Sequence, residues 1–230
     1  MDQNEILQFL KGVLDPDRFH VLEQWINSSK QKEELKLKQP LKKLAIVVGH
    51  NANSQGAVRP DTGETEFVYN GKMAKEMVTL GVDYDLDVKV FYRSSHGGYS
   101  AEISRVYAEV DKWGADASIE LHFNAAGNPA ASGTETLSSG SPKSLALAQE
   151  VQMEMVEELG LKDRGIKIRN SRTKGRGYQS LIAGNAPAIL TEPFFATSSI
   201  GRKETDEPYE RTKLAMSILE GANRAIRSFE

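Results

Sequence analysis

Two histidines and two glutamates stand at positions from which they could jointly bind a metal ion. His50 and His122 each follow a strand-like run, and the run before His50 has five consecutive apolar residues. Glu192 ends a third such run, and Glu66 opens a segment with helical periodicity. A catalytic zinc site commonly takes three ligands of these types and leaves a fourth position to water. The four side chains therefore predict a zinc hydrolase.

The other histidines give a weaker signal. The chain has four histidines and no cysteine, so thiolate zinc sites and disulfides are excluded. His20 lies on a predicted helix near the N-terminus, and His96 lies in a glycine-rich loop. We expect surface or capping roles for both, although His96 could approach a substrate.

The hydrophobic pattern places these side chains on an α/β fold. Strand-like runs alternate with amphipathic segments, which is typical of a mostly parallel or mixed sheet between helices. Open sheets of this kind bind ligands at the carboxyl ends of their strands. We expect a central sheet of about six strands flanked by helices. The clearest strands cover 44–48, 87–92, 117–122, 133–137 and 188–192, the clearest helices 66–80, 99–113, 142–159 and 208–229, and a basic loop 162–176.

Residues 1–38 differ from the rest of the chain. Apolar residues recur there every three or four positions in two stretches, and Asp15-Pro16 restarts the helix between them. A charged stretch up to Pro40 has the composition of a linker. We predict an N-terminal helical hairpin with its linker at 1–38 and the main domain at 39–230. The apolar stripes of the hairpin favour packing over a binding function.

Bulk composition excludes several other classes of protein. A formal net charge of −3 gives no reason to expect nucleic acid or an acidic membrane as partner. No apolar run approaches the roughly 20 residues that span a bilayer. The first residues lack a basic flank followed by an apolar core, so we expect no secretory signal and synthesis in the cytoplasm. Composition leaves the oligomeric state open.

Four motifs occur in a fixed order: Ile46-Val-Val-Gly-His50, Glu66, Leu121-His-Phe-Asn-Ala125 and Leu190-Thr-Glu-Pro-Phe-Phe195. In this order they resemble the motifs of the amidase type 3 family, the zinc-dependent N-acetylmuramoyl-L-alanine amidases, over residues 42–229. Arg93 and Arg105 also fall where that family has arginines. The resemblance implies one zinc ion per chain, held by His50, Glu66 and His122, with Glu192 as catalytic acid/base. The implied reaction is hydrolysis of the amide bond between N-acetylmuramic acid and L-alanine in peptidoglycan.

The chain departs from the family pattern at three places. The usual Asp-Pro-Gly-His-Gly-Gly is Val47-Val-Gly-His-Asn-Ala52 here, Ser-Ile-His is Glu120-Leu-His122, and Gly-Phe is Pro193-Phe194. The helix register favours Glu66 over Glu64 as the third ligand, and Glu64 stays an alternative.

Substrate contacts are expected from Asn124, two residues after the second histidine, and from Arg169, Arg172, Lys174 and Arg176 in the basic segment. Arginine pairs well with the carboxylates of an acidic stem peptide, but a solvated surface loop explains the same charges equally well. Two other functions stay open, a zinc carboxypeptidase or related amidohydrolase on a similar scaffold and a non-catalytic cell-wall binding module. An amidase without an export signal fits a phage endolysin released by a holin, a toxin-like effector, or a chain whose signal was removed.

Overall fold

The computed structural model describes residues 3–16, 18–24, 26–27 and 40–229. The chain divides into two compact units, Met1–Leu41 and Lys42–Glu230. In the first unit, helix α1 (Gln3–Val13) precedes further helical residues, 16, 18–24 and 26–27. The ammonium group of Lys11 lies 6.0 Å from the ring centre of Phe19, so the two helical stretches contact each other. Most of the predicted linker lies outside the described residues.

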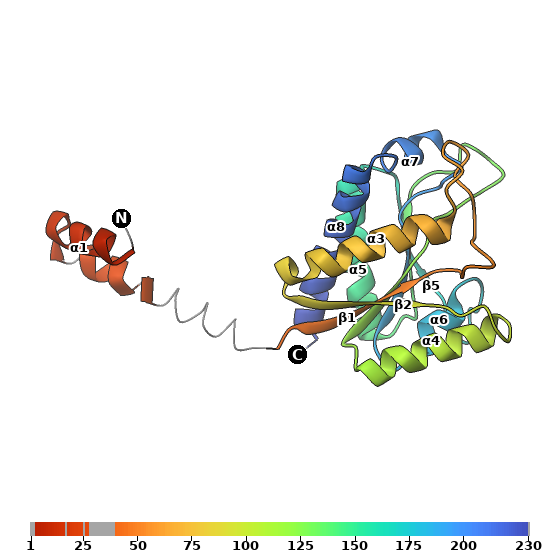
Figure 1. Ribbon diagram of the computed structural model, residues 1–230, viewed down its shortest axis with the longest axis horizontal. Coiled ribbons are helices and arrows are strands. Elements are labelled where there is room, and N and C mark those ends of the chain that lie inside the picture. Colours follow the sequence, from red (N-terminus) through yellow and green to blue (C-terminus); the bar gives the residue numbers. More distant parts are fainter. Residues whose placement is uncertain (1–2, 17, 25, 28–39, 230) are drawn as a thin grey trace. The chain divides into compact units, whose positions relative to one another are not determined.

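The second unit is built on a six-stranded sheet with the order β2-β1-β3-β6-β4-β5 (Figure 1). Four neighbouring strands are parallel, namely β2 (Leu86–Tyr92), β1 (Lys42–Val48), β3 (Ala117–Leu121) and β6 (Ala188–Glu192). Strand β4 (Thr134–Ser138) is antiparallel to β6, and β5 (Asp163–Ile168) lies parallel to β4 at the edge. This topology confirms the prediction of a mixed six-stranded α/β sheet.

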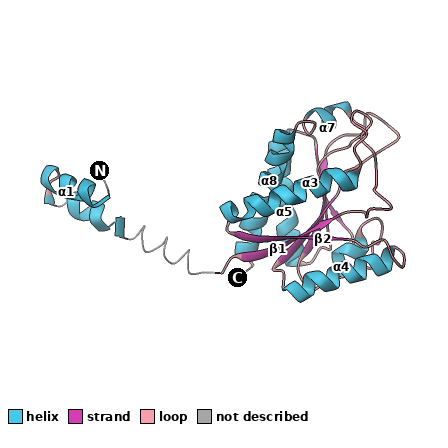
Figure 2. Cartoon of the chain, in the orientation of Figure 1, coloured by secondary structure: helices cyan, strands magenta, loops and turns pink. Residues whose placement is uncertain are grey.

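Helices cover both faces of the sheet (Figure 2). On one face, α3 (Glu66–Leu80), α5 (Pro142–Leu159) and α8 (Pro208–Arg227) pack over strand residues such as Ile46 and Ile119. On the other face, α4 (Tyr99–Trp113) and α6 (Tyr178–Ile182) pack over Val47 and Leu190. Because successive strand residues point to opposite faces, a strand covered on both sides is mostly apolar, as residues 44–48 of β1 are. Two short helices complete the unit, η1 (Gly81–Tyr84) and α7 (Ser199–Lys203).

The strand order creates a crevice at the carboxyl ends of β1 and β3. From β1 the chain crosses to β2 on one side, and from β2 it returns to β3 on the other side of β1. Open α/β sheets bind ligands where the strand order switches in this way. His50 follows β1 and His122 follows β3, so both histidines lie at the switch point.

The prediction of a basic loop over residues 162–176 is wrong for its first half. Residues 163–168 form the edge strand β5, which pairs with β4 from Thr134 opposite Asp163 to Ser138 opposite Ile168. Charged side chains conceal this strand in the sequence, because an edge strand is partly exposed and carries charges that discourage further pairing.

Among the helices of the described residues, none has the length and apolar character needed to cross a membrane.

Candidate metal centre

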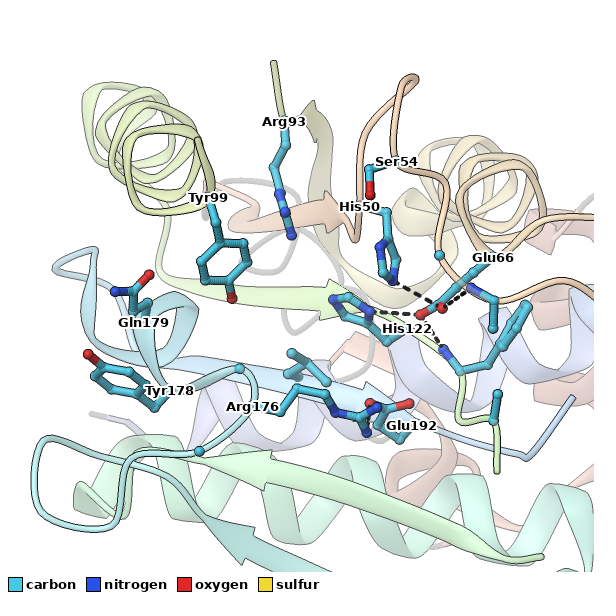
Figure 3. A pocket seen from close by; sticks show the side chains of 17 residues that line it. His50, Ser54, Glu66, Arg93, Tyr99, His122, Arg176, Tyr178, Gln179 and Glu192 are labelled. Carbon is cyan, nitrogen blue, oxygen red and sulfur yellow. Dashed lines mark hydrogen bonds and ion pairs between the residues drawn. The ribbon is translucent and has the colours of Figure 1, made fainter. Parts of the chain in front are cut away.

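Three elements bring three possible zinc ligands together at the switch point (Figure 3). His50 follows β1, Glu66 is the first residue of α3, and His122 follows β3. One ligand atom of each side chain lies within 4.8 Å of the other two. Glu66 bridges the histidines, with Oε2 3.0 Å from His50 Nε2 and Oε1 2.7 Å from His122 Nδ1. Two imidazoles and one carboxylate are a donor set used by catalytic zinc, so these residues fit that ion.

Local sequence explains how Glu66 reaches this point. The Thr65 hydroxyl accepts a hydrogen bond from the backbone amide of Val68 at 3.3 Å, which caps α3 and makes Glu66 its first residue. The backbone amides of Phe123 and Ala57 donate to the Glu66 carboxylate at 3.0 and 3.2 Å. A carboxylate is also favoured in the first turn of a helix by the helix dipole. Glu66 is therefore held by its own helix and by two neighbouring loops.

Two glycines leave room for the ligand side chains. A Cβ added to Gly49 would lie 2.5 Å from the His122 ring. A Cβ added to Gly56 would lie 2.6 Å from both Glu66 Oε2 and His50 Nε2. His50 itself has a φ of 67°, which is uncommon for a residue other than glycine. Such strained backbone concentrates at functional sites, where the surrounding structure holds it in place.

The carboxylate and the imidazoles stabilise each other's charged forms. Burial alone would raise the pKa of Glu66, but hydrogen bonds with His122 and His50 hold that pKa well below its usual value. Burial alone would lower the pKa of His122, but hydrogen bonds with Glu120 and Glu66 raise it to about 10. A ligating imidazole nitrogen must give up its proton before it binds a metal ion. Metal affinity at this centre should therefore decrease as the pH is lowered.

Glu192 lines the same cavity as Glu66, but its environment has the opposite effect on the pKa of its carboxyl group. Its side chain is 2% exposed, and Oε1 accepts a hydrogen bond from Arg176 Nη2 at 2.6 Å. Oε2 has no hydrogen-bond partner among the described residues. Burial raises the pKa of Glu192 to about 7, against the opposing charges of His122 and Arg176. A carboxyl group with this pKa can accept and release protons near neutral pH.

A cavity of about 680 Å³ contains these groups. Figure 3 shows the two histidines and Glu66 along one side and a second wall opposite them, which Tyr99, Tyr178 and Gln179 form. Tyr99 opens α4 and Tyr178 opens α6, so the second wall comes from the helices on one face of the sheet. The volume is within the range of small-molecule binding sites.

None of Asn124, Arg169 and Arg172 lines the cavity, but Asn124 contacts Arg176, which does. Asn124 Oδ1 accepts a hydrogen bond from Arg176 Nη2 at 2.8 Å, and its Nδ2 donates to Glu135 Oε1 at 3.0 Å. Arg169 donates to a backbone carbonyl of its own segment, and Arg172 is exposed. Within the basic segment, Arg176 is the residue that reaches Glu192.

The alternative ligand Glu64 and His96 lie outside the site, and His20 belongs to the first unit. Glu64 Oε1 pairs with Lys72 Nζ at 2.6 Å. The exposed His20 hydrogen-bonds to Gln24 at 2.9 Å within the first unit. His96 is exposed in the loop before α4. Neither Glu64 nor His96 lines the cavity.

Two contacts of the site were absent from the sequence interpretation. Glu120 Oε1 lies 3.0 Å from His122 Nε2, and residues two apart on a strand share a face. This contact could therefore have been predicted. The Arg176–Glu192 ion pair depends on how the loop after β5 returns toward β6, and no local pattern shows that return.

Residues 44–224 match the family Amidase 3, N-acetylmuramoyl-L-alanine amidase. The chain belongs to this family, which confirms the resemblance carried by its motifs. It is accordingly a peptidoglycan hydrolase of the class that cleaves between N-acetylmuramic acid and L-alanine. No significant match was found among curated protein sequences.

Solved structures of two amidases and of an endolysin catalytic domain share the fold. The N-acetylmuramoyl-L-alanine amidase from Clostridium difficile 630 is 24% identical, with 84% of this chain and 100% of that chain covered and a TM-score of 0.69. The catalytic domain of CwlV, an amidase from Bacillus (Paenibacillus) polymyxa var. colistinus, is 22% identical, with coverage of 80% and 97% and a TM-score of 0.66. The catalytic domain of an endolysin targeting Clostridia difficile is 24% identical, with coverage of 79% and 96% and a TM-score of 0.67.

Proposed function

We propose that residues 39–230 form a zinc-dependent amidase domain with one zinc ion held by His50, Glu66 and His122. The observation that carries this proposal is the convergence of the three ligands, from three separate elements, to within 4.8 Å. A zinc ion bound there would lower the pKa of a water molecule toward ~7 and polarise the scissile carbonyl. The roles of the surrounding residues follow from their contacts.

Glu192 is the proposed acid/base of the reaction. Amide hydrolysis requires a proton to leave the attacking water and a proton to reach the departing L-alanine amine. Glu192 lines the same cavity as the three ligands, and burial raises the pKa of its carboxyl group, which favours uptake and release of a proton. Arg176 binds Oε1 of this carboxyl group at 2.6 Å, which leaves Oε2 to take up the proton.

Arg176 and Asn124 are proposed to position Glu192 and to contact the substrate. The Arg176 side chain is 64% exposed, yet its Nη2 reaches both Glu192 and Asn124. A substrate that enters the cavity would therefore meet this guanidinium beside the acid/base. Arg169 and Arg172 could contact only those parts of a stem peptide that extend beyond the cavity.

The proposed site of action is the cell wall, with peptidoglycan or a muramoyl-peptide as substrate. One similar structure is the catalytic domain of an endolysin, and an endolysin made in the cytoplasm would reach the wall after holin-mediated release. This route is part of the proposal.

Metal and product analysis test the proposal. Protein purified without added metal should contain close to one zinc ion per chain, and His50→Ala or His122→Ala should lose it. His96→Ala is the matched control, because this histidine is exposed and lies outside the cavity. Intact peptidoglycan should yield new L-alanine amino termini without new reducing sugar ends.

Three results would contradict the proposal. Full zinc retention in His50→Ala or His122→Ala would reject the ligand assignment. New reducing ends would identify a glycosidase, and cleavage of free peptides without cleavage of muramoyl-peptides would favour a carboxypeptidase.

A further inference from the structure

A buried polar network lies behind His122, on the side away from Glu66. Its central member is Glu120, the fourth of the five residues of the buried strand β3, which has no exposed surface. Glu120 Oε1 lies 3.0 Å from His122 Nε2, whereas Glu66 Oε1 lies 2.7 Å from His122 Nδ1. The imidazole is therefore held between two carboxylates, one at each ring nitrogen.

Two donors from neighbouring elements fix Glu120. Arg93 Nη1 donates to Oε1 at 3.3 Å, and the Tyr107 hydroxyl donates to Oε2 at 3.1 Å. All three side chains are buried. Burying a charge is costly unless it is paired and hydrogen-bonded, and these contacts satisfy both conditions. The carboxylate therefore has a defined orientation when it meets the imidazole.

The network continues to the other histidine. Arg93 Nη2 donates to Glu102 Oε2 at 3.4 Å, and Glu102 Oε2 accepts a second hydrogen bond from Asn51 Nδ2 at 2.9 Å. Asn51 directly follows His50, whose φ of 67° needs support from its surroundings. The chain Glu120–Arg93–Glu102 thus connects His122 with the residue next to His50.

We infer that Glu120 is a positioning residue for the metal centre, which holds His122 so that its Nδ1 faces Glu66 and His50. This inference rests on the proposed function, because it concerns a ligand of the proposed zinc site. By accepting the Nε2–H, Glu120 selects the tautomer whose lone pair is on Nδ1. Hydrogen-bond partners of this kind orient a ligating histidine and increase its basicity. Glu120 contacts the proposed ligand His122, but among the described residues it is not one of the three proposed ligands themselves.

Zinc affinity and the tautomer of His122 test this role. In full-length protein, Glu120→Ala should weaken zinc binding by about 10–100-fold in competition with a chelator, as is usual for such partners. Glu120→Gln should lose less, because its amide oxygen can still accept the Nε2–H. In the zinc-loaded wild type, a proton–nitrogen NMR correlation should show His122 protonated at Nε2, and Glu120→Ala should lose the hydrogen-bonded Nε2–H signal.

Glu135→Gln is the matched control. Glu135 is also a buried glutamate of the sheet, and it pairs with Arg164 Nε at 2.8 Å without touching either histidine. The Glu135→Gln variant should bind zinc with the affinity of the wild type. If Glu120→Ala fails to fold, Glu120→Gln still carries the test, because it preserves the shape of the side chain.

The possible failures are distinct. Folded Glu120 variants that bind zinc as tightly as the wild type, with an unchanged His122 signal, would overturn this inference alone. A wild-type protein that binds no zinc would overturn the proposed function and this inference with it.

Discussion

Replacing Glu192 by Gln should inactivate the enzyme and at the same time stabilise its fold at neutral and alkaline pH. The substitution keeps the shape of the side chain but removes its ability to carry a proton. General acid–base catalysis contributes about 10²–10⁴-fold to rate. Turnover should therefore fall by that factor, a loss of about 3–5 kcal/mol of transition-state stabilisation. Zinc content should stay at the wild-type level, since Glu192 is outside the ligand group.

The effect on stability follows from the raised pKa of Glu192. Burial raises the pKa of this carboxyl group from 4.5 to about 7 in the folded protein. Folding therefore favours the protonated form, and stability is lost as pH rises from 4.5 through about 7. A shift of this size corresponds to about 3 kcal/mol once the group is fully ionised. Glu192→Gln cannot ionise, so its free energy of unfolding should rise relative to the wild type over this range.

Urea unfolding of both proteins between about pH 4 and pH 8 measures the difference. The proteins should be treated with a chelator, because a bound cation would lower the pKa of Glu192. Other groups titrate in the same range, but they are common to both proteins and cancel in the comparison. Stability curves that stay parallel across this range would refute the raised pKa. An active Glu192→Gln variant would refute the catalytic role.

Two further predictions concern the glycine beside the ligands and the N-terminal unit. Gly56→Ala should weaken zinc binding by at least tenfold, because its Cβ would lie 2.6 Å from Glu66 Oε2 and His50 Nε2. Gly127→Ala, where a Cβ would meet nothing within 4 Å, should bind zinc normally in the same chelator competition, and equal affinities would contradict the close approach. A chain that begins at Pro40 should fold and bind zinc, since the compact second unit starts at Lys42. An insoluble or molten product by circular dichroism would show that the first unit belongs to the same core.

The sequence was sufficient to predict those parts of the fold in which local pattern and burial agree. Residues 44–48 of strand β1 are covered on both faces and are all apolar, so His50 stands out just beyond the end of the strand. Helix α3 begins where a capping threonine precedes Glu66. Parallel strands have their carboxyl ends at one edge, which is why residues far apart in the chain could be predicted to meet.

The sequence was insufficient where tertiary contacts override local pattern. Strand β5 contains charged residues of the kind expected in a loop. It can carry them because it is an edge strand, with β4 on one side and solvent on the other. Arg176 reaches Glu192 from the segment between β5 and α6, where Gly175 and Gly177 have φ values of 89° and 80°. Side-chain charge alone could not distinguish Arg176 from Arg169 or Arg172.

The two strand glutamates near the metal centre show how one sheet can hold two carboxyl groups in opposite states. Glu120 is buried, but hydrogen bonding to His122 and the charges of His122 and Arg93 lower its pKa to about 2. Glu192 is also buried, but it has one arginine contact and an oxygen without a partner among the described residues, and its pKa is about 7. Environments that separate the pKa values of paired carboxyl groups are how enzymes assign different roles to them. The contacts therefore favour Glu120 as a permanent anion that orients His122 and Glu192 as the group that exchanges protons during the reaction.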